Sequence, residues 1–254
     1  MLRYKSWIDT RSRFLLGLSI LLVFACGTAV TFSRVQELAA SLPQDAVLGN
    51  EALQQEIQES LELVRTFPGY AWSQWFAGNF PALLTIFAAL LGSGNPLVKS
   101  GSGALFSLAL PVSRARWIRA RAETGIAELF VLALAPGLLI AALAPFVGGQ
   151  FALIDAVVYG LCAFVVASLF FGIAMFFSTL WNDVWRPLLL TCLVAIALMA
   201  AGTALPETQG LFEAMAGQSY FYDGVLPWFQ LLLSAAGAAG LIYAAAANVT
   251  RRDF

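Results

Sequence analysis

The segment GALFSLALPVSRARWIRAR, residues 103–121, lies between two long apolar runs of the chain. It contains a helix-breaking proline, Pro111, followed by four arginines. Basic residues are otherwise scarce, because Lys and Arg together number 14 in 254 residues. A cluster of arginines beside an apolar run marks the cytoplasmic face of a membrane. The segment therefore predicts a membrane protein with this stretch in the cytoplasm. On charge alone, the arginines need do no more than fix topology.

The composition agrees with a membrane protein. Hydrophobic residues make up 60% of the chain and charged residues 11%, whereas soluble domains contain about 45–50% and about 25%. A length of 254 residues leaves room for several helical spans of about 20 residues each and for little else. We therefore expect an all-α integral membrane protein with six transmembrane helices, and residues 1–254 to form a single transmembrane domain.

The apolar runs give the positions of these helices. The predicted spans are residues 14–33, 76–98, 126–143, 153–178, 187–204 and 229–247. Residues 1–13 predict a short helix lying in the membrane interface, because helical spacing puts Tyr4, Trp7 and Ile8 on one face. Every Lys and Arg except Arg34 and Arg65 then falls in a predicted cytoplasmic segment. The positive-inside rule accordingly places both termini in the cytoplasm.

Two segments are predicted to lie on the outer side, at residues 34–75 and 205–228. The first ends with Trp72 and Trp75, which suit an outer interfacial belt of aromatic residues. The second is half apolar, which favours partial burial in the membrane over a position clear of it. In the last span, small residues recur from Ser234 to Gly240 and predict close helix packing, within the subunit rather than at a dimer seam.

Missing residue types exclude several classes of function. The chain has no histidine, which excludes His-dependent intramembrane enzymes and leaves poor ligands for a metal. Its three cysteines lie inside apolar runs without disulfide or metal spacing. No G-x-x-x-x-G-K-[ST] motif is present, so any ATP must be bound by another subunit. We expect no catalytic residue, metal or cofactor in this chain.

Glu128 is the most informative single residue. It lies two helical turns after Arg121, in the cytoplasmic half of the third predicted span. An ionised carboxylate in hydrocarbon costs several kcal/mol unless it is paired or faces protein. Pairing with an arginine of residues 1–13 or of the basic segment is the favoured interpretation, and a role in coupling or in the substrate path is the alternative. With Glu128 as the one such carboxylate, an ion-coupled secondary transporter is disfavoured.

The stretches GALFSLALPVSR (residues 103–114) and RARAETGIAELFVLAL (residues 119–134) resemble the loop between the second and third spans of the type-2 ABC transporter permease family. In that family the loop carries a short helix that docks into a partner ATPase and ends in Pro-Val-Ser-Arg. The resemblance extends to an N-terminal elbow helix and, more weakly, to the tail TRRDF at residues 250–254. Family members often have acidic residues before the loop's glycine, whereas this chain has VKSG at residues 98–101, so the charge pairing is expected to differ.

The resemblance implies a coupling loop at residues 99–121. The apolar side chains of Leu105, Phe106 and Leu108 would fill a groove in the ATPase, and Pro111 would end the short helix. Arg114 and Arg116 would hold the loop at the lipid surface or on the ATPase. The implied function is that of a permease subunit of an ATP-binding cassette transporter, favoured as an exporter, in the bacterial inner membrane.

The implied partners are a cytoplasmic ATPase subunit carrying ATP and Mg²⁺, a second permease subunit and membrane lipid, with no nucleic acid. A homodimer and a heterodimer fit equally well. The alternative function is a non-transporting membrane scaffold or signal-transmitting subunit that uses the same loop to bind a cytoplasmic partner.

Overall fold

The structure is a computed structural model that describes residues 2–41, 62–94, 114–181, 183–204 and 210–251. These residues form helices, and the described part of the chain contains no strand. Six helical segments are long and apolar enough to cross a membrane, which confirms the predicted number. They are α1 (Leu2–Ser41), the run α3–η1–α4 (Phe67–Ala71, Trp72–Asn79, Phe80–Gly92), α6 (Arg114–Leu143), α7 (Leu153–Leu180), α8 (Trp185–Ala204) and α11 (Trp228–Arg251).

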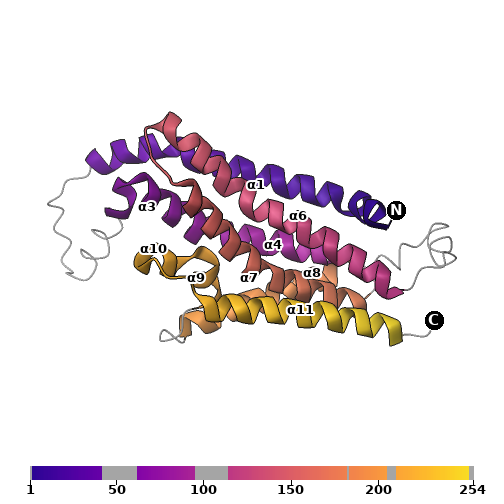
Figure 1. The fold of residues 1–254 in the computed structure, drawn as a ribbon. Helices are drawn as coiled ribbons and strands as arrows, with labels where there is room; N and C mark the ends of the chain where they lie inside the picture. Colours follow the sequence, from indigo (N-terminus) through magenta and orange to yellow (C-terminus); the bar gives the residue numbers. More distant parts are fainter. Residues whose placement is uncertain (1, 42–61, 95–113, 182, 205–209, 252–254) are drawn as a thin grey trace.

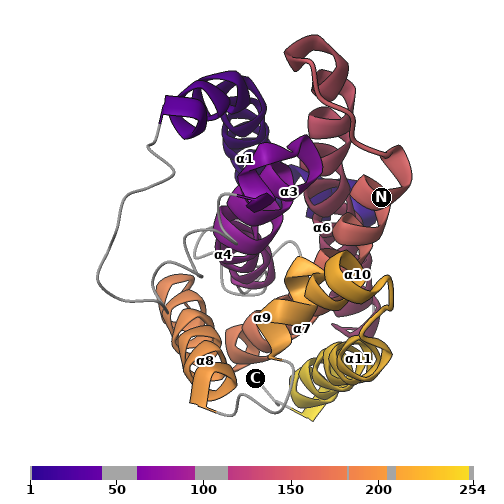
Figure 2. The same ribbon diagram turned by 90° about the vertical axis from the view of Figure 1, so that its left-hand side faces the viewer.

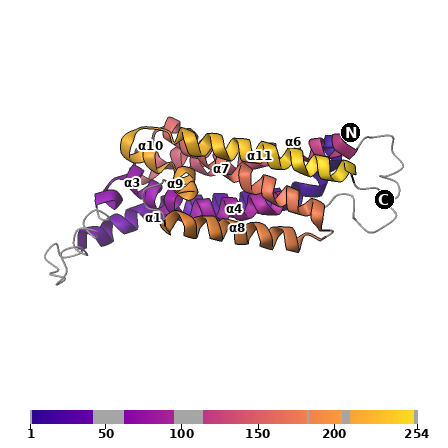
Figure 3. The same ribbon diagram turned by 90° about the horizontal axis from the view of Figure 1, so that it is seen from below.

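The six segments lie side by side as a bundle (Figure 1). The N-terminal end of α1 and the C-terminal end of α11 lie at the same end of the bundle (Figures 1 and 3). The C-terminal end of α4 and the N-terminal end of α6 lie at that end as well (Figure 1), and most of the predicted coupling loop falls between them in the sequence. This arrangement agrees with an even number of crossings, and the assignment of this end to the cytoplasm stays a prediction from charge.

Helix α1 differs from the predicted division into an interfacial helix and a span. It runs from Leu2 to Ser41 as one helix, since residues 2–16 contain neither proline nor glycine to end it. Seen along the bundle, the N-terminus lies across α6 from the main part of α1 (Figure 2). The first turns therefore cross α6 without a break in the helix. Their position at the membrane interface stays a prediction.

The second span is formed by three consecutive helical pieces. It begins at Phe67 rather than at residue 76. Thr66 caps this start, because its side chain accepts a hydrogen bond from the backbone N–H of Gly69 at 3.3 Å. The π-helix η1 widens the backbone over Trp72–Asn79. Pro81, which lacks an N–H, follows this π-helix in the first turn of α4. The segment ends at Gly92, short of the predicted residue 98.

The two tryptophans predicted for an outer belt are buried instead. Trp72 is 6% exposed and Trp75 0%. The indole Nε1 of Trp72 donates a hydrogen bond to the carbonyl of Ala216 at 3.1 Å, and its ring stacks on Phe221 with centroids 4.3 Å apart. Phe221 and Ala216 come from the second outer segment, which folds back over the start of the second span. The interfacial interpretation was therefore wrong, because the covering residues lie far along the sequence.

The described part of this outer segment forms two short helices, α9 (Leu211–Ala216) and α10 (Gln218–Asp223). Both lie at the end of the bundle opposite the N-terminus, beside α3 and α7 (Figure 1). Met215 is 1% exposed, so α9 is packed into the bundle. Tyr220 on α10 donates a hydrogen bond to Asp155 on α7 at 2.9 Å, and this bond raises the pKa of the Tyr220 hydroxyl.

Helix α11 uses its small residues to pack against α7. Ser234 and Ala245 are 0% exposed, and a Cβ at Gly237 would lie 2.8 Å from the Cδ1 atom of Leu169. On α7, a Cβ at Gly172 would lie 3.2 Å from the carbonyl oxygen of Ala238. A methyl group at Gly172 would press on the backbone of α11 and one at Gly237 on the side chain of Leu169, so the small residues allow the two helices to approach closely. Ser234, Gly237 and Ala238 thus pack within the subunit, as predicted, whereas Gly240 is exposed with nothing within 4 Å of an added Cβ.

Gly217, between α9 and α10, is constrained both by its backbone conformation and by the space around it, and comparison with Gly224 separates the two effects. Its φ is +67°, and an added Cβ would lie 2.7 Å from the ring of Tyr159. Gly224 has a φ of +69° with nothing within 4 Å of such a Cβ. We expect Gly224→Ala to cost about 1–2 kcal/mol for the left-handed backbone and Gly217→Ala to cost more. Thermal unfolding in detergent should rank the wild type above Gly224→Ala and Gly217→Ala last; equal losses would contradict the packing described at Tyr159.

Candidate functional site

Of the six predicted coupling residues, the structure describes Arg116, describes Arg114 only in its backbone and does not describe the other four. Leu105, Phe106, Leu108 and Pro111 lie outside the described residues. Arg114 begins α6, and its side chain is outside the described residues as well. The side chain of Arg116 is exposed. The third spanning helix thus begins at Arg114 rather than at residue 126, so the arginines that sequence analysis assigned to a loop lie on the first turns of a helix.

The C-terminal end of α4 is held by two arginines from other helices. Arg13 on α1 donates hydrogen bonds from Nη1 to the carbonyls of Leu90 (3.0 Å) and Ser93 (2.8 Å). Arg121 on α6 donates from Nη2 to the carbonyls of Leu91 (3.3 Å) and Ser93 (3.0 Å). We call Arg13 and Arg121, together with the carbonyls of Leu90, Leu91 and Ser93 that they bind, the arginine clamp. It joins α1, α4 and α6 a few residues before residue 99, where the predicted coupling loop begins.

The clamp follows from the chemistry of a helix end. The last carbonyls of a helix have no intrahelical donor and carry partial negative charge. Water cannot satisfy them in a buried site, so cationic side chains from neighbouring helices do. Gly94 has a φ of +109°, and a Cβ there would lie 3.3 Å from Nη1 of Arg13 and 3.5 Å from Nη2 of Arg121. Glycine therefore suits this position both by its backbone and by the space that the guanidinium groups occupy.

Glu128 lies within the same group of helices and is buried, with 3% of its surface exposed. The hydroxyl of Thr10 on α1 donates a hydrogen bond to its Oε1 atom. Arg121 and Glu128 also attract each other electrostatically along α6. Among the described residues, the second carboxylate oxygen, Oε2, has no hydrogen-bond partner. The predicted pairing with an arginine is therefore not made within the described part of the chain, and the hydrogen bond comes from a threonine.

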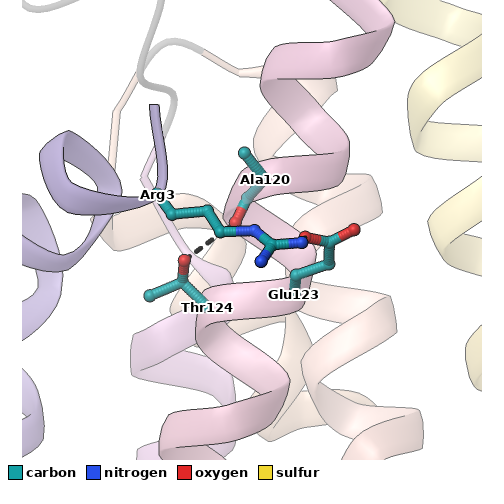
Figure 4. A network of polar contacts seen from close by, with 4 residues as sticks. All are labelled: Arg3, Ala120, Glu123 and Thr124. Carbon is teal, nitrogen blue, oxygen red and sulfur yellow. Dashed lines mark hydrogen bonds and ion pairs between the residues drawn. The ribbon is translucent and has the colours of Figure 1, made fainter. Parts of the chain in front are cut away.

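Further contacts hold the first turns of α1 against α6. Arg3 forms an ion pair with Glu123 at 2.7 Å, and Figure 4 shows its side chain extending over α6 toward that carboxylate. In the same view, the hydroxyl of Thr124 bonds back to the carbonyl of Ala120 at 2.8 Å. Lys5 lies 5.7 Å from the ring centroid of Trp117. An exposed ion pair contributes little stability, so these contacts mainly orient the start of α1.

From the sequence, Arg13 and Arg121 are two of the basic residues that fix the topology, and nothing in it predicts the clamp. Helical phase offered a signal on α1, because Thr10, Arg13 and Gly17 share a face with the apolar Phe14 and Leu21. Thr10, Phe14 and Leu21 are all buried. A basic residue in phase with a buried face is expected to bond to protein. Its acceptors, backbone carbonyls some 80 residues away, leave no mark in the sequence.

This chain matches no family model, no curated protein and no solved structure. The interpretation of the site accordingly rests on the residues and geometry described above. Those residues offer hydrogen-bond donors and one buried carboxylate, and the described part of the chain contains no cluster of three potential metal ligands. The arrangement is suited to holding helices together and to changing how they are held.

The Thr10–Glu128 contact can be tested by removing the hydroxyl at constant shape. Thr10→Val leaves the buried carboxylate without its described donor, which should cost about 1–3 kcal/mol. Thr10→Ser keeps the hydroxyl and serves as the control. We expect the melting temperature of the purified protein in detergent to fall for Thr10→Val and to stay near that of the wild type for Thr10→Ser. A loss of equal size in both variants would attribute the effect to packing of the methyl group.

Proposed function

We propose that this chain is the permease subunit of a bacterial ABC transporter of the inner membrane, acting as an exporter. The observation that carries the proposal is the position of the family-like stretch at residues 103–114. It occupies the interval between α4, which ends at Gly92, and α6, which begins at Arg114. Both of these helices are parts of membrane-spanning segments by length and composition. A partner that engages this interval would act on two spans at once.

The ends of the interval are mechanically connected to the bundle. The carbonyls of Ser93 and Leu91 bond to Arg121, so the end of α4 is joined to the first turns of α6. The bonds from Arg13 add α1 to the same joint. A displacement of the interval would therefore act directly on α1, α4 and α6. This is the property that coupling to a nucleotide-driven partner requires.

The partner would supply the chemistry that this chain lacks. The sequence contains no phosphate-binding loop, so ATP and Mg²⁺ would be bound by a separate cytoplasmic ATPase. A second permease subunit would complete the transporter. In the proposed cycle, closure of the ATPases displaces residues 105–111, and the spans reorient around a central path for substrate. The exposed Arg116 would contact the ATPase or lipid headgroups.

Affinity purification of the tagged protein in mild detergent tests this proposal. We expect a soluble protein with a phosphate-binding loop to co-purify with the wild type and to be lost from Phe106→Asp, because a carboxylate would not enter an apolar groove. Ser102→Asp adds the same charge outside the apolar stretch and should retain the partner. Both variants should insert into the membrane as the wild type does. Recovery of the wild type alone, or with a partner lacking a nucleotide site, would favour the scaffold function instead.

A further inference from the structure

We propose that Arg121 is a positioning residue with two alternative partners: the carbonyls at the end of α4, as seen here, and the carboxylate of Glu128 once that end is displaced. The inference rests on the proposed function, because the displacing force would come from the ATPase. It adds a role for Glu128 that the clamp by itself does not require.

Two buried polar atoms of opposite charge point to the second arrangement. Arg121 is 8% exposed and Glu128 3%. Among the described residues, Nε of Arg121 and Oε2 of Glu128 both lack a hydrogen-bond partner. Leaving one charged group incompletely bonded in a protein interior is costly. Here two such groups of complementary charge occur on one helix.

The spacing on α6 allows the two side chains to meet. Residues seven apart lie on the same face of a helix, separated by two turns or about 10.5 Å. The long arginine side chain and the glutamate can span that distance together. Thr10 already binds Oε1 of Glu128 from α1 and so leaves Oε2 as the available acceptor. Formation of the pair needs a change in the side chain of Arg121, with α6 remaining intact.

Electrostatic repulsion between Arg13 and Arg121 opposes the arrangement seen here. Arg13 and Arg121 both donate to the carbonyl of Ser93, at 2.8 and 3.0 Å, and their like charges repel each other. Asp9 acts on both guanidinium groups as the compensating charge from α1. The second bond of Arg121, to Leu91, is long at 3.3 Å. Moving the end of α4 would break weak bonds, relieve this repulsion and allow Arg121 to bond with Glu128.

Such an exchange gives the joint two discrete states instead of an elastic response. In the first state the end of α4 is bonded to α1 and α6. In the second it retains Arg13 alone, and Arg121 reinforces the contact between α6 and Thr10 of α1. Elements with two arrangements of similar free energy are what convert a small displacement into a conformational change.

The test compares Glu128→Gln with Glu123→Gln in the complex of permease and ATPase. Glutamine at position 128 still accepts the hydrogen bond from Thr10 but offers Arg121 no charge. Glu123 is exposed on the same helix and loses the same charge. Spin labels replace two exposed residues, Ile86 on α4 and Ala127 on α6, in a background without Cys26, Cys162 and Cys192. Distances between the labels are measured in the nucleotide-free complex and after trapping with ATP and vanadate.

We expect ATP trapping to populate a second distance in the wild type and in Glu123→Gln. In Glu128→Gln this population should fall by about fivefold or more, the lower end of typical coupling between sites. The melting temperature of the nucleotide-free complex should stay close to that of the wild type, because glutamine keeps the hydrogen bond from Thr10 and none of the hydrogen bonds of the clamp involves Glu128. Glu128→Asp, which restores a carboxylate, should recover part of the population.

Each contrary result has one meaning. A wild-type population in Glu128→Gln overturns the inference, and so does a fall in that variant accompanied by a lower melting temperature, which would make Glu128 purely structural. A wild-type complex that forms but shows no second distance also overturns it, while leaving the proposed function standing. Failure to recover any ATPase with the wild type would instead overturn the proposed function.

Discussion

The backbone carbonyls at the end of α4 constrain the rest of the molecule. A helix that ends inside a bundle leaves its last carbonyls without donors, and in the absence of water each must be satisfied by protein. Here the donors are Arg13 and Arg121, from α1 and α6. Three helices are thereby joined at one point, where the buried Arg121 and the half-buried Arg13 lie next to each other. The neighbouring Thr10 and Glu128 add a second contact between α1 and α6, a hydrogen bond from the threonine hydroxyl to the carboxylate.

The opposite end of the bundle is held by different forces. There Trp72 stacks on Phe221, Phe32 packs edge-on against Phe67, and the indole of Trp72 bonds to the carbonyl of Ala216. Close-packed aromatic rings have few alternative arrangements, because a shift opens space that nothing fills. A cluster of charged and polar groups can exchange partners without leaving a cavity. The fold therefore combines one end packed by aromatic rings with another joined by polar contacts, and the proposed exchange of partners is placed at the polar end.

The two proposals join these observations into one mechanism. The interval between α4 and α6 begins beside Ser93, whose carbonyl bonds to both Arg13 and Arg121, so a force on the interval would act on the arginine clamp. Arg121 is the residue through which that force would pass into α6, and Glu128 is the acceptor that would hold it afterwards. Helices α1 and α6 each carry two arginines that are two residues apart, and their positions give them different surroundings. They are Arg11 and Arg13 on α1, and Arg119 and Arg121 on α6. On each helix the first arginine is exposed, while Arg121 is buried and Arg13 bonds to protein.

The sequence by itself determined the fold class and the number of spans. Apolar runs of sufficient length must cross a membrane as helices, whatever they pack against. It also singled out Glu128, because a carboxylate within an apolar run needs a partner. The partners were decided only by the tertiary structure. By composition, Trp72 and Trp75 were expected at the membrane interface. Both tryptophans are buried instead, and α9 and α10 cover Trp72. The same limit applied to Arg13 and Arg121, because their acceptors are backbone carbonyls, which every residue carries and no sequence pattern distinguishes.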